Sequence, residues 1–462
     1  MPAGQKNYIL PRPGRIGLRT HRFAVISFVS LFLALTTGAH PVQVAVTAPV
    51  AAVEIRLDGQ TVGRLDRSPW ALTCDFGARL QPHELVAIGF GSDGGELERI
   101  RQWINLPRPA AEADLMLEEG EPNGRLAARL IWRSLQYSAP AAVRFFLDGA
   151  PIAAASWDRL LLPACDLDKV HVLSAEVHFS DRVSLRVERG FGGEYGTQAA
   201  TELTAVPLLL GRGPRDQELP PLGELQGWLA AGGEPLRVLG AERGPAKIIL
   251  VIDAHARELV KRWRLQRVLP RWPGGSTAPL GEADRLHLLW PVARTVAQAE
   301  AATDLFPLSP PLGSRDGELP WLIASSTIPP GDYGPQRLAD AVAGAGVHAV
   351  AGNYRRAVVL ALGGKYEDRS ERASVEMARA FLSDLHVPLV VWRLGIDSAK
   401  AGATPWGEAR PIASLTDLGA AAAELQNALD RQRILWVEGR HLPQTIQLAP
   451  GATSRGPRGL LD

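Results

Sequence analysis

The chain has 462 residues, with 50 Lys and Arg against 49 Asp and Glu. At roughly 150 residues per domain, this length predicts about three domains. The near-zero net charge argues against a nucleic-acid binder, whose basic face usually shows in the total. With 46% hydrophobic and 21% charged residues the chain can bury large cores. Its two cysteines exclude a disulfide-dense scaffold and a cysteine-based zinc module.

The amino terminus has the order of an export signal. Residues 1–22 contain basic side chains and no acid, residues 23–36 form an apolar run, and Thr37-Gly38-Ala39 supplies small residues. This order predicts a secretory signal peptide over residues 1–39, cleaved after Ala39. An uncleaved signal anchor and a buried core helix are the alternatives. We therefore expect an exported protein, periplasmic, cell-surface or secreted, which contacts the membrane only through residues 23–39 if these are retained.

An internal repeat follows the amino terminus. Three segments recur in the same order at offsets of about 90 residues: residues 51–59 with 141–149, Cys74-Asp75 with Cys165-Asp166, and residues 83–93 with 171–181. Within each copy, apolar residues alternate with polar ones and an Asp-Gly pair marks a hairpin. The repeat predicts two small all-β sandwiches, over residues 40–112 and 113–205.

These two units resemble the Ig-like modules that precede von Willebrand factor A-type domains in exported bacterial proteins. Cys74 and Cys165 occupy equivalent positions of separate units, whereas a disulfide needs Cα atoms within about 7 Å. We expect two buried free thiols. The repeated His83 and His171 are expected at strand edges or turns, in preference to metal ligands.

The pattern changes after a Pro/Gly-rich segment, residues 206–243, which is expected to be a linker. Buried apolar runs then alternate with helical spacing, and this predicts an α/β domain over residues 244–440 with a doubly wound, mainly parallel sheet. Asp368, with Glu371, is expected to cap the helix that ends near Leu385. A flexible tail, residues 441–462, follows. The predicted strands lie at residues 247–253, 286–292, 357–362, 389–394 and 434–437.

This succession resembles a von Willebrand A-type (Rossmann-like) domain. The landmarks are the strand that ends in Val251-Ile252-Asp253, the helix that contains residues 338–341, and the strand over residues 355–360. The resemblance implies a divalent cation at the carboxyl ends of the strands, held by an Asp-x-Ser-x-Ser motif, a Thr and a late Asp. Hydroxyl and carboxylate oxygens suit Mg²⁺ or Mn²⁺.

Only one residue of that metal motif is retained. Asp253 is present, but His255 and Arg257 replace the two Ser, Gln336 falls at the Thr position, and Gly363 replaces the late Asp. The sequence therefore predicts no metal site, and it predicts that Asp253 caps the following helix. A substitute carboxylate from Glu367 or Asp368 would need a rearranged loop.

No motif for a nucleophile, a phosphate-binding loop or a metalloprotease occurs, so we expect no catalytic residue and no cofactor. The leading interpretation is a non-enzymatic exported protein-interaction protein with a partner that the sequence does not identify. The alternatives are a metal-dependent adhesion module, an exported enzyme that uses Asp253 and His255, and a structural scaffold subunit.

Overall fold

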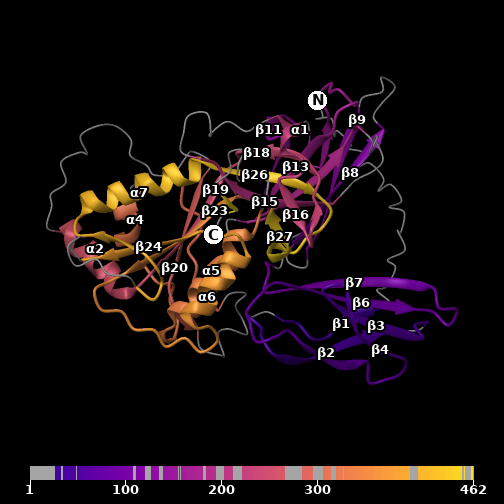
Figure 1. The fold of residues 1–462 in the computed structure, drawn as a ribbon, viewed down its shortest axis with the longest axis horizontal. Helices are drawn as coiled ribbons and strands as arrows, with labels where there is room; N and C mark the ends of the chain where they lie inside the picture. The colour runs from indigo at the N-terminus through magenta and orange to yellow at the C-terminus, as the bar shows by residue number, and fades with distance from the viewer. Residues whose placement is uncertain are drawn as a thin grey trace, which may run out of the picture. The chain divides into compact units, whose positions relative to one another are not determined.

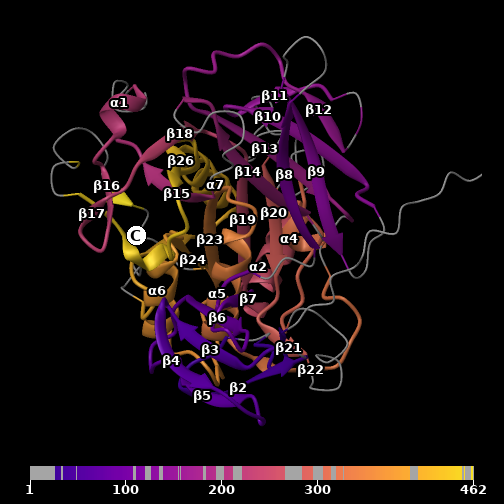
Figure 2. The same ribbon diagram turned by 90° about the vertical axis from the view of Figure 1, so that its right-hand side faces the viewer.

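A computed structural model of the chain describes most of the sequence (Figures 1 and 2). By the contacts between Cα atoms it divides into two compact units, residues 1–31, 41–74 and 86–101 in one and the remaining residues in the other. The described residues are 26–32, 35–47, 49–107, 111–119, 126–134, 139–154, 156, 158–180, 184–193, 202–211, 221–265, 284–294, 305–313, 319–325, 327–395, 404–449, 452 and 459–460.

The first repeat unit is a β-sandwich. One sheet has the strand order β4-β3-β6-β7 and the other the order β1-β2-β5. Asp58 and Gly59 both have positive φ, 51° and 80°, which is the backbone of the tight hairpin turn that the Asp-Gly pair predicts. The strands are β1 (Ile26–Phe28), β2 (Ala39–Val46), β3 (Ala52–Leu57), β4 (Gln60–Leu65), β5 (Ala71–Asp75), β6 (His83–Phe90) and β7 (Glu96–Ile104).

The second repeat unit has the same design. Its larger sheet has the order β11-β10-β13-β14, the counterpart of β4-β3-β6-β7, and faces a sheet of order β12-β9-β8 (Figure 2). Asp148 and Gly149 again turn the hairpin with positive φ, 49° and 79°. The predicted pair of β-sandwiches is confirmed. The strands are β8 (Ala111–Glu119), β9 (Leu126–Ser134), β10 (Ala142–Leu147), β11 (Ala150–Ile152), β12 (Arg159–Leu161), β13 (His171–His178) and β14 (Ser184–Phe191).

The repeated histidines and cysteines take structural positions. His83 and His171 are the first residues of β6 and β13, and the Nε2 atom of each lies 3.0 Å from a carbonyl oxygen of the preceding loop. Both cysteines are free, as predicted; Cys74 is buried, whereas Cys165 is only partly buried. Burial raises the pKa of the Cys74 thiol to about 11.

A parallel sheet of order β20-β19-β23-β24-β25 forms the core of the carboxyl-terminal half. Alternate residues of β19 and β23 face opposite sides, one packed against α5 and α6 and the other against α2, α4 and α7 (Figure 1). The elements are β19 (Ala246–Ile252), α2 (Ala254–Leu265), β20 (Arg285–Leu289), α4 (Leu319–Ser325), α5 (Leu338–Val350), β23 (Arg355–Leu362), α6 (Val375–Asp384), β24 (Leu389–Leu394), β25 (Ala409–Ile412) and α7 (Leu415–Asp430).

The last predicted strand belongs elsewhere, and this corrects the sequence-based assignment. β26 (Gln432–Glu438) is antiparallel to β15 and β18 in a separate sheet, and β25, which the sequence did not predict, is the fifth parallel strand. An apolar run such as Ile434–Val437 suits either sheet, because its pattern specifies burial and not a partner strand.

The expected linker and tail are also folded where the structure describes them. Both contribute to the sheet β18-β26-β15-β28 and to the sheet β17-β16-β27. Val206, Leu208, Trp228, Leu435 and Ile446 share one apolar core, which explains why Pro/Gly-rich sequence is ordered here. The elements are β15 (Leu203–Leu209), α1 (Leu222–Leu225), β16 (Leu229–Ala231), β17 (Glu234–Pro235), β18 (Val238–Glu242), η4 (Pro443–Thr445), β27 (Ile446–Leu448) and β28 (Gly459–Leu460); a hairpin of β21 (Val292–Arg294) and β22 (Tyr333–Gln336) lies beyond β20.

Part of the predicted signal segment lies in a sheet. Residues 1–25 are outside the described residues, but β1 pairs with β2 and Ile26 is 1% exposed. The described part of the apolar run therefore supplies Ile26 to the core, which differs from the assignment of residues 1–39 to a signal peptide. No helix among the described residues is long and apolar enough to cross a membrane.

Candidate functional site

The candidate site lies at the carboxyl ends of the parallel strands. The chain leaves β19 for β20 on one side and later returns as β23 on the other side. In open α/β sheets such a reversal of strand order leaves a crevice at the carboxyl ends, where ligands commonly bind. Asp253 follows β19 directly and Gly363 follows β23, so two of the five predicted positions meet at this point.

The Asp253 carboxylate is buried and bonded on both oxygens. The residue is 2% exposed. Its Oδ2 atom accepts hydrogen bonds from the backbone N–H of Gly363 at 2.9 Å and of Ala256 at 3.2 Å. Its Oδ1 atom accepts from Nε2 of Gln336 at 2.9 Å. The bond from Ala256, in the first turn of α2, confirms the predicted helix cap.

Gln336 links Asp253 to the loop that follows β23. Its Nε2 atom also donates to the carbonyl oxygen of Glu367 at 3.0 Å, and its Oε1 atom accepts from the backbone N–H of Ala254 at 3.1 Å. Two acceptors around the nitrogen and one donor at the oxygen fix the orientation of the amide. The side chain at the position where the resemblance implies Thr therefore presents N–H groups to Asp253 instead of an oxygen ligand.

Gly363 leaves no space for a side chain. A Cβ atom at this position would lie 2.6 Å from Cβ of His255 and 2.9 Å from both the backbone nitrogen of Ala256 and Oδ2 of Asp253. The β23 loop thus approaches α2 through glycine backbone. A carboxylate at this position would require the two segments to separate.

The two residues in place of serine lie on the first turn of α2. His255 is exposed, and Arg257 is partly buried. Neither side chain offers an oxygen ligand, and a guanidinium group near a metal position opposes a cation by charge repulsion.

These residues do not fit a divalent cation. Asp253 is the one oxygen ligand of the family pattern, and its oxygens already accept three hydrogen bonds. Mg²⁺ gives up its water reluctantly and needs several oxygen ligands. In the described parts of the chain, no group of three or more His, Cys, Asp or Glu side chains is arranged to hold a metal ion.

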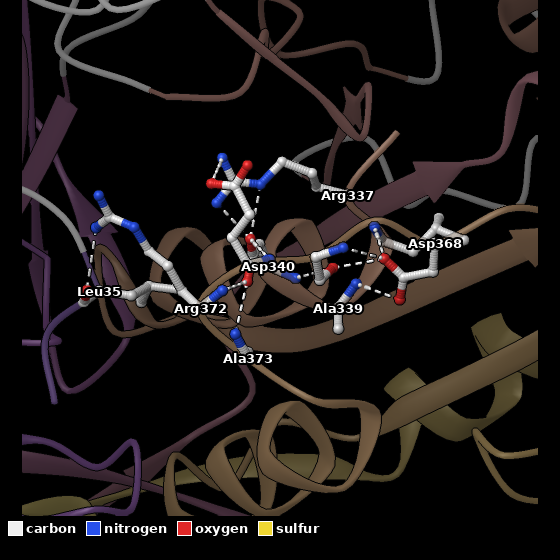
Figure 3. Close-up of polar contacts among 10 residues, drawn as sticks. Leu35, Arg337, Ala339, Asp340, Asp368, Arg372 and Ala373 are labelled. Carbon is white, nitrogen blue, oxygen red and sulfur yellow. Dashed lines mark hydrogen bonds and ion pairs between the residues drawn. The ribbon is translucent and has the colours of Figure 1, made fainter. Parts of the chain in front are cut away.

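Asp368 does not act as either prediction proposed. Its Oδ1 atom accepts from the backbone N–H of Leu338 at 2.8 Å, and its Oδ2 atom accepts from that of Ala339 at 3.2 Å. It therefore caps α5, which precedes it in the chain, and it is not the cap of α6 (Figure 3). The cap of α6 is Ser374, whose hydroxyl accepts from the N–H of Met377.

A second buried carboxylate, which the sequence did not single out, holds the same loop. Asp340 in the first turn of α5 is 0% exposed. Its carboxylate accepts hydrogen bonds from the backbone N–H groups of Glu371, Arg372 and Ala373. It also forms an ion pair with Arg337, in which Oδ2 lies 2.5 Å from a terminal guanidinium nitrogen (Figure 3). A buried Asp inside an otherwise apolar helix face was the available signal, because a buried charge needs partners. Together with Asp368 it ties the β23–α6 loop to α5.

Comparisons with known proteins identify no family. No protein-family model matches the chain, and no match was found among curated proteins. Among solved structures, Clostridium thermocellum CbhA fibronectin(III)-like modules are 13% identical, with 17% of this chain and 92% of theirs covered and a TM-score of 0.16. The central fibronectin-III array of RIM-binding protein is 8% identical, with 46% and 78% covered and a TM-score of 0.21. Bacteroides ovatus SGBP-B of the mixed-linkage glucan utilization locus is 10% identical, with 44% and 80% covered and a TM-score of 0.13. At these scores the similarities carry no argument about function.

Proposed function

We propose that this chain is an exported, non-enzymatic protein-interaction or scaffold protein, built on a von Willebrand A-type domain whose metal position is closed. The observation that supports the proposal is the Asp253 carboxylate, which is used for three internal hydrogen bonds at the point where such a domain would bind its cation. The alternation of strands and helices and the position of Asp253 after β19 support the domain type.

The same hydrogen bonds weigh against the two chemical alternatives. A general base needs a lone pair directed at its substrate, whereas the Asp253 oxygens face Gln336, Gly363 and Ala256. A metal-dependent adhesion module would need ligands beyond this single carboxylate. Binding through the exposed backbone and side chains around His255 needs neither.

Site-specific crosslinking in the native cell envelope tests the binding proposal. A photo-crosslinking amino acid replaces His255, which is exposed at the carboxyl end of the sheet. The matched control carries it at Asn427, exposed near the end of α7 at the opposite end of the sheet. A discrete protein adduct at 255 and none at 427 supports the proposal. Equal labelling at both positions, loss of the adduct with EDTA, or turnover of a peptide, ester or glycan by the purified chain would contradict it.

Export is part of the proposal and has its own test. The proposal of export is based on the order of residues 1–36, in which basic residues precede an apolar run. Strand β1 lies within that apolar run. Residues 26–28 cannot act as a signal and pair with β2 at the same time. Sequencing the amino terminus of the native protein should give a start near His40, with β1 removed, or a membrane-attached chain that retains residues 23–39. Soluble cytoplasmic protein that starts at Met1 would refute export.

A further inference from the structure

A row of charged residues crosses the outer face of the second sandwich. Glu176 in β13 lies directly opposite Arg144 in β10 on one side and Arg186 in β14 on the other. Two residues along on the same face, Ser174 in β13 lies opposite Glu188 in β14. Such an outer face would ordinarily be solvated. Here Glu176 is 2% exposed, Arg186 9% and Glu188 8%, so these three charged residues are covered, whereas the Arg144 side chain is 52% exposed.

The covering groups come from two other parts of the fold. Glu242, the last residue of β18, lies with its Oε1 atom 2.7 Å from a terminal nitrogen of Arg186. The Arg186 guanidinium also lies over the ring of Trp436 in β26, 5.4 Å from its centroid. From the turn before β23, Asn353 donates to Glu188 at 3.3 Å. The cluster therefore joins the sandwich to the β18–β26 sheet and to the parallel-sheet half.

The charges in this cluster do not balance. Two guanidinium groups, Arg144 and Arg186, face three carboxyl groups, Glu176, Glu188 and Glu242. Arg144 pairs with Glu176 at 2.5 Å, which leaves Arg186 between the other two carboxyls. Oε1 of Glu188 lies 3.2 Å and Oε1 of Glu242 lies 2.7 Å from nitrogen atoms of Arg186, so both carboxyls share one guanidinium group. One buried negative charge is therefore in excess when all three acids are ionised.

Burial raises the pKa of two of these acids. Desolvation raises the pKa of Glu188 to about 7, opposed by Arg186 and reinforced by Glu242. Desolvation likewise raises the pKa of Glu242. The other titratable groups nearby do not offset the charge, because burial raises the pKa of Tyr354 and lowers that of His178, and both are then neutral.

We infer that Glu188, buried with Arg186 and Glu242, forms a proton-sensitive joint between the second sandwich and the rest of the carboxyl-terminal fold. Below neutral pH, Glu188 holds a proton while the faces are packed and releases it when they separate into water. This inference does not depend on the proposed function.

The direction of the pH dependence follows from the linkage between proton binding by Glu188 and opening of the joint. The carboxyl binds a proton more tightly in the packed state than in the opened one, so the contribution is fully present below the ordinary pKa near 4.5 and is lost as pH rises through about 7. With these two values, the equilibrium constant for opening of the joint rises about tenfold between pH 6 and pH 8.

Hydrogen–deuterium exchange of the full chain tests this locally. Peptides that cover β14 and β18 are followed at pH 6 and pH 8, each rate divided by the intrinsic exchange rate at that pH. We expect about tenfold more opening at pH 8 in these peptides and no such change in β23. Glu188→Gln, a neutral mimic of the protonated acid, should reduce the ratio to about one. Glu234→Gln, the same change at an exposed position of β17, should leave it at about ten.

The results distinguish the joint from general acid effects. A tenfold ratio that persists in Glu188→Gln, a wild-type ratio near one, or an equal change in β23 would each overturn the inference. If Glu188→Gln does not fold, Glu242→Gln serves instead. Removal of the neighbouring carboxylate should lower the pKa of Glu188 and shrink the ratio, and an unchanged ratio there would also overturn it.

Discussion

Replacing Asp253 by Ala should destabilise the α/β half by more than the loss of an ordinary helix cap does. Loss of a cap costs about 1 kcal/mol. This carboxylate also bonds the N–H of Gly363 and the amide of Gln336. A buried donor left without a partner costs about 1–3 kcal/mol, and the partly exposed Gln336 amide can turn towards water. We therefore expect a total of about 2–4 kcal/mol.

Exchange of backbone amides in the full chain gives the local measurement. A loss of about 3 kcal/mol corresponds to roughly a hundredfold increase in opening, since 1.4 kcal/mol is a factor of ten. The increase should appear in the first turns of α2 and in the loop after β23, the segments that Asp253 joins. The strands of both sandwiches should exchange as in the wild-type chain.

Asp253→Asn is the matched control. The amide keeps one oxygen acceptor for the N–H groups of Ala256 and Gly363, but its nitrogen faces the donor nitrogen of Gln336. We expect a cost of about 1 kcal/mol, well below that of Ala. If Ala and Asn cost the same, or if Ala costs less than about 0.5 kcal/mol, the three hydrogen bonds do not stabilise this edge and the reasoning is refuted.

Three other measurements test the remaining assignments. Isothermal titration should show no Mg²⁺ or Mn²⁺ binding up to low-millimolar concentrations, and EDTA should leave the melting temperature unchanged, because an ion that does not bind the native state cannot stabilise it; a shift would restore the metal-dependent alternative. Asp368→Ala should cost about 1–2 kcal/mol and increase exchange at the start of α5, whereas Arg369→Ala, a neighbouring exposed position, should change neither. Thiol labelling without reductant should count two free thiols after denaturation, and Cys74 should react far more slowly than Cys165 in the folded chain at pH 7–8, because the Cys74 thiol is buried with a pKa of about 11; a crosslinked peptide of the two would contradict this.

Local patterns predicted the strands well and their partners poorly. The apolar runs at β19, β23 and β24 and the two Asp-Gly turns are where the sequence places them. β25, with the sequence ARPI, lacks an apolar run because it is an edge strand and only Ile412 in it is buried. β15 and β16 pair with strands more than 200 positions away, and β18 pairs with residues 192 to 199 positions away, so no local window contains these partners.

The candidate site shows the same division. The role of Asp253 as a cap was predictable because its donor lies three residues ahead, within one helical turn. The role of Asp368 was not, because the N–H groups that it caps precede it by about 30 residues. An acid followed by Glu371 three positions on fits a capping box equally well, and only the path of the loop decides which helix end receives the carboxylate.

Asp253, Gln336 and Gly363 close the predicted metal position together, and no one of them does so alone. Without the donors from Gln336 and Gly363, the buried Asp253 carboxylate would keep only the N–H of Ala256, and the N–H of Gly363 can approach it because Gly363 has no side chain. An acid at position 363 would push the β23 loop away from α2, remove one of these donors and place a second negative charge beside the first. A Thr at position 336 would be too short to keep the three bonds that the Gln amide makes. Each single substitution towards the metal-binding pattern should therefore cost stability without completing a set of ligands, which favours the hydrogen-bonded arrangement for this sequence.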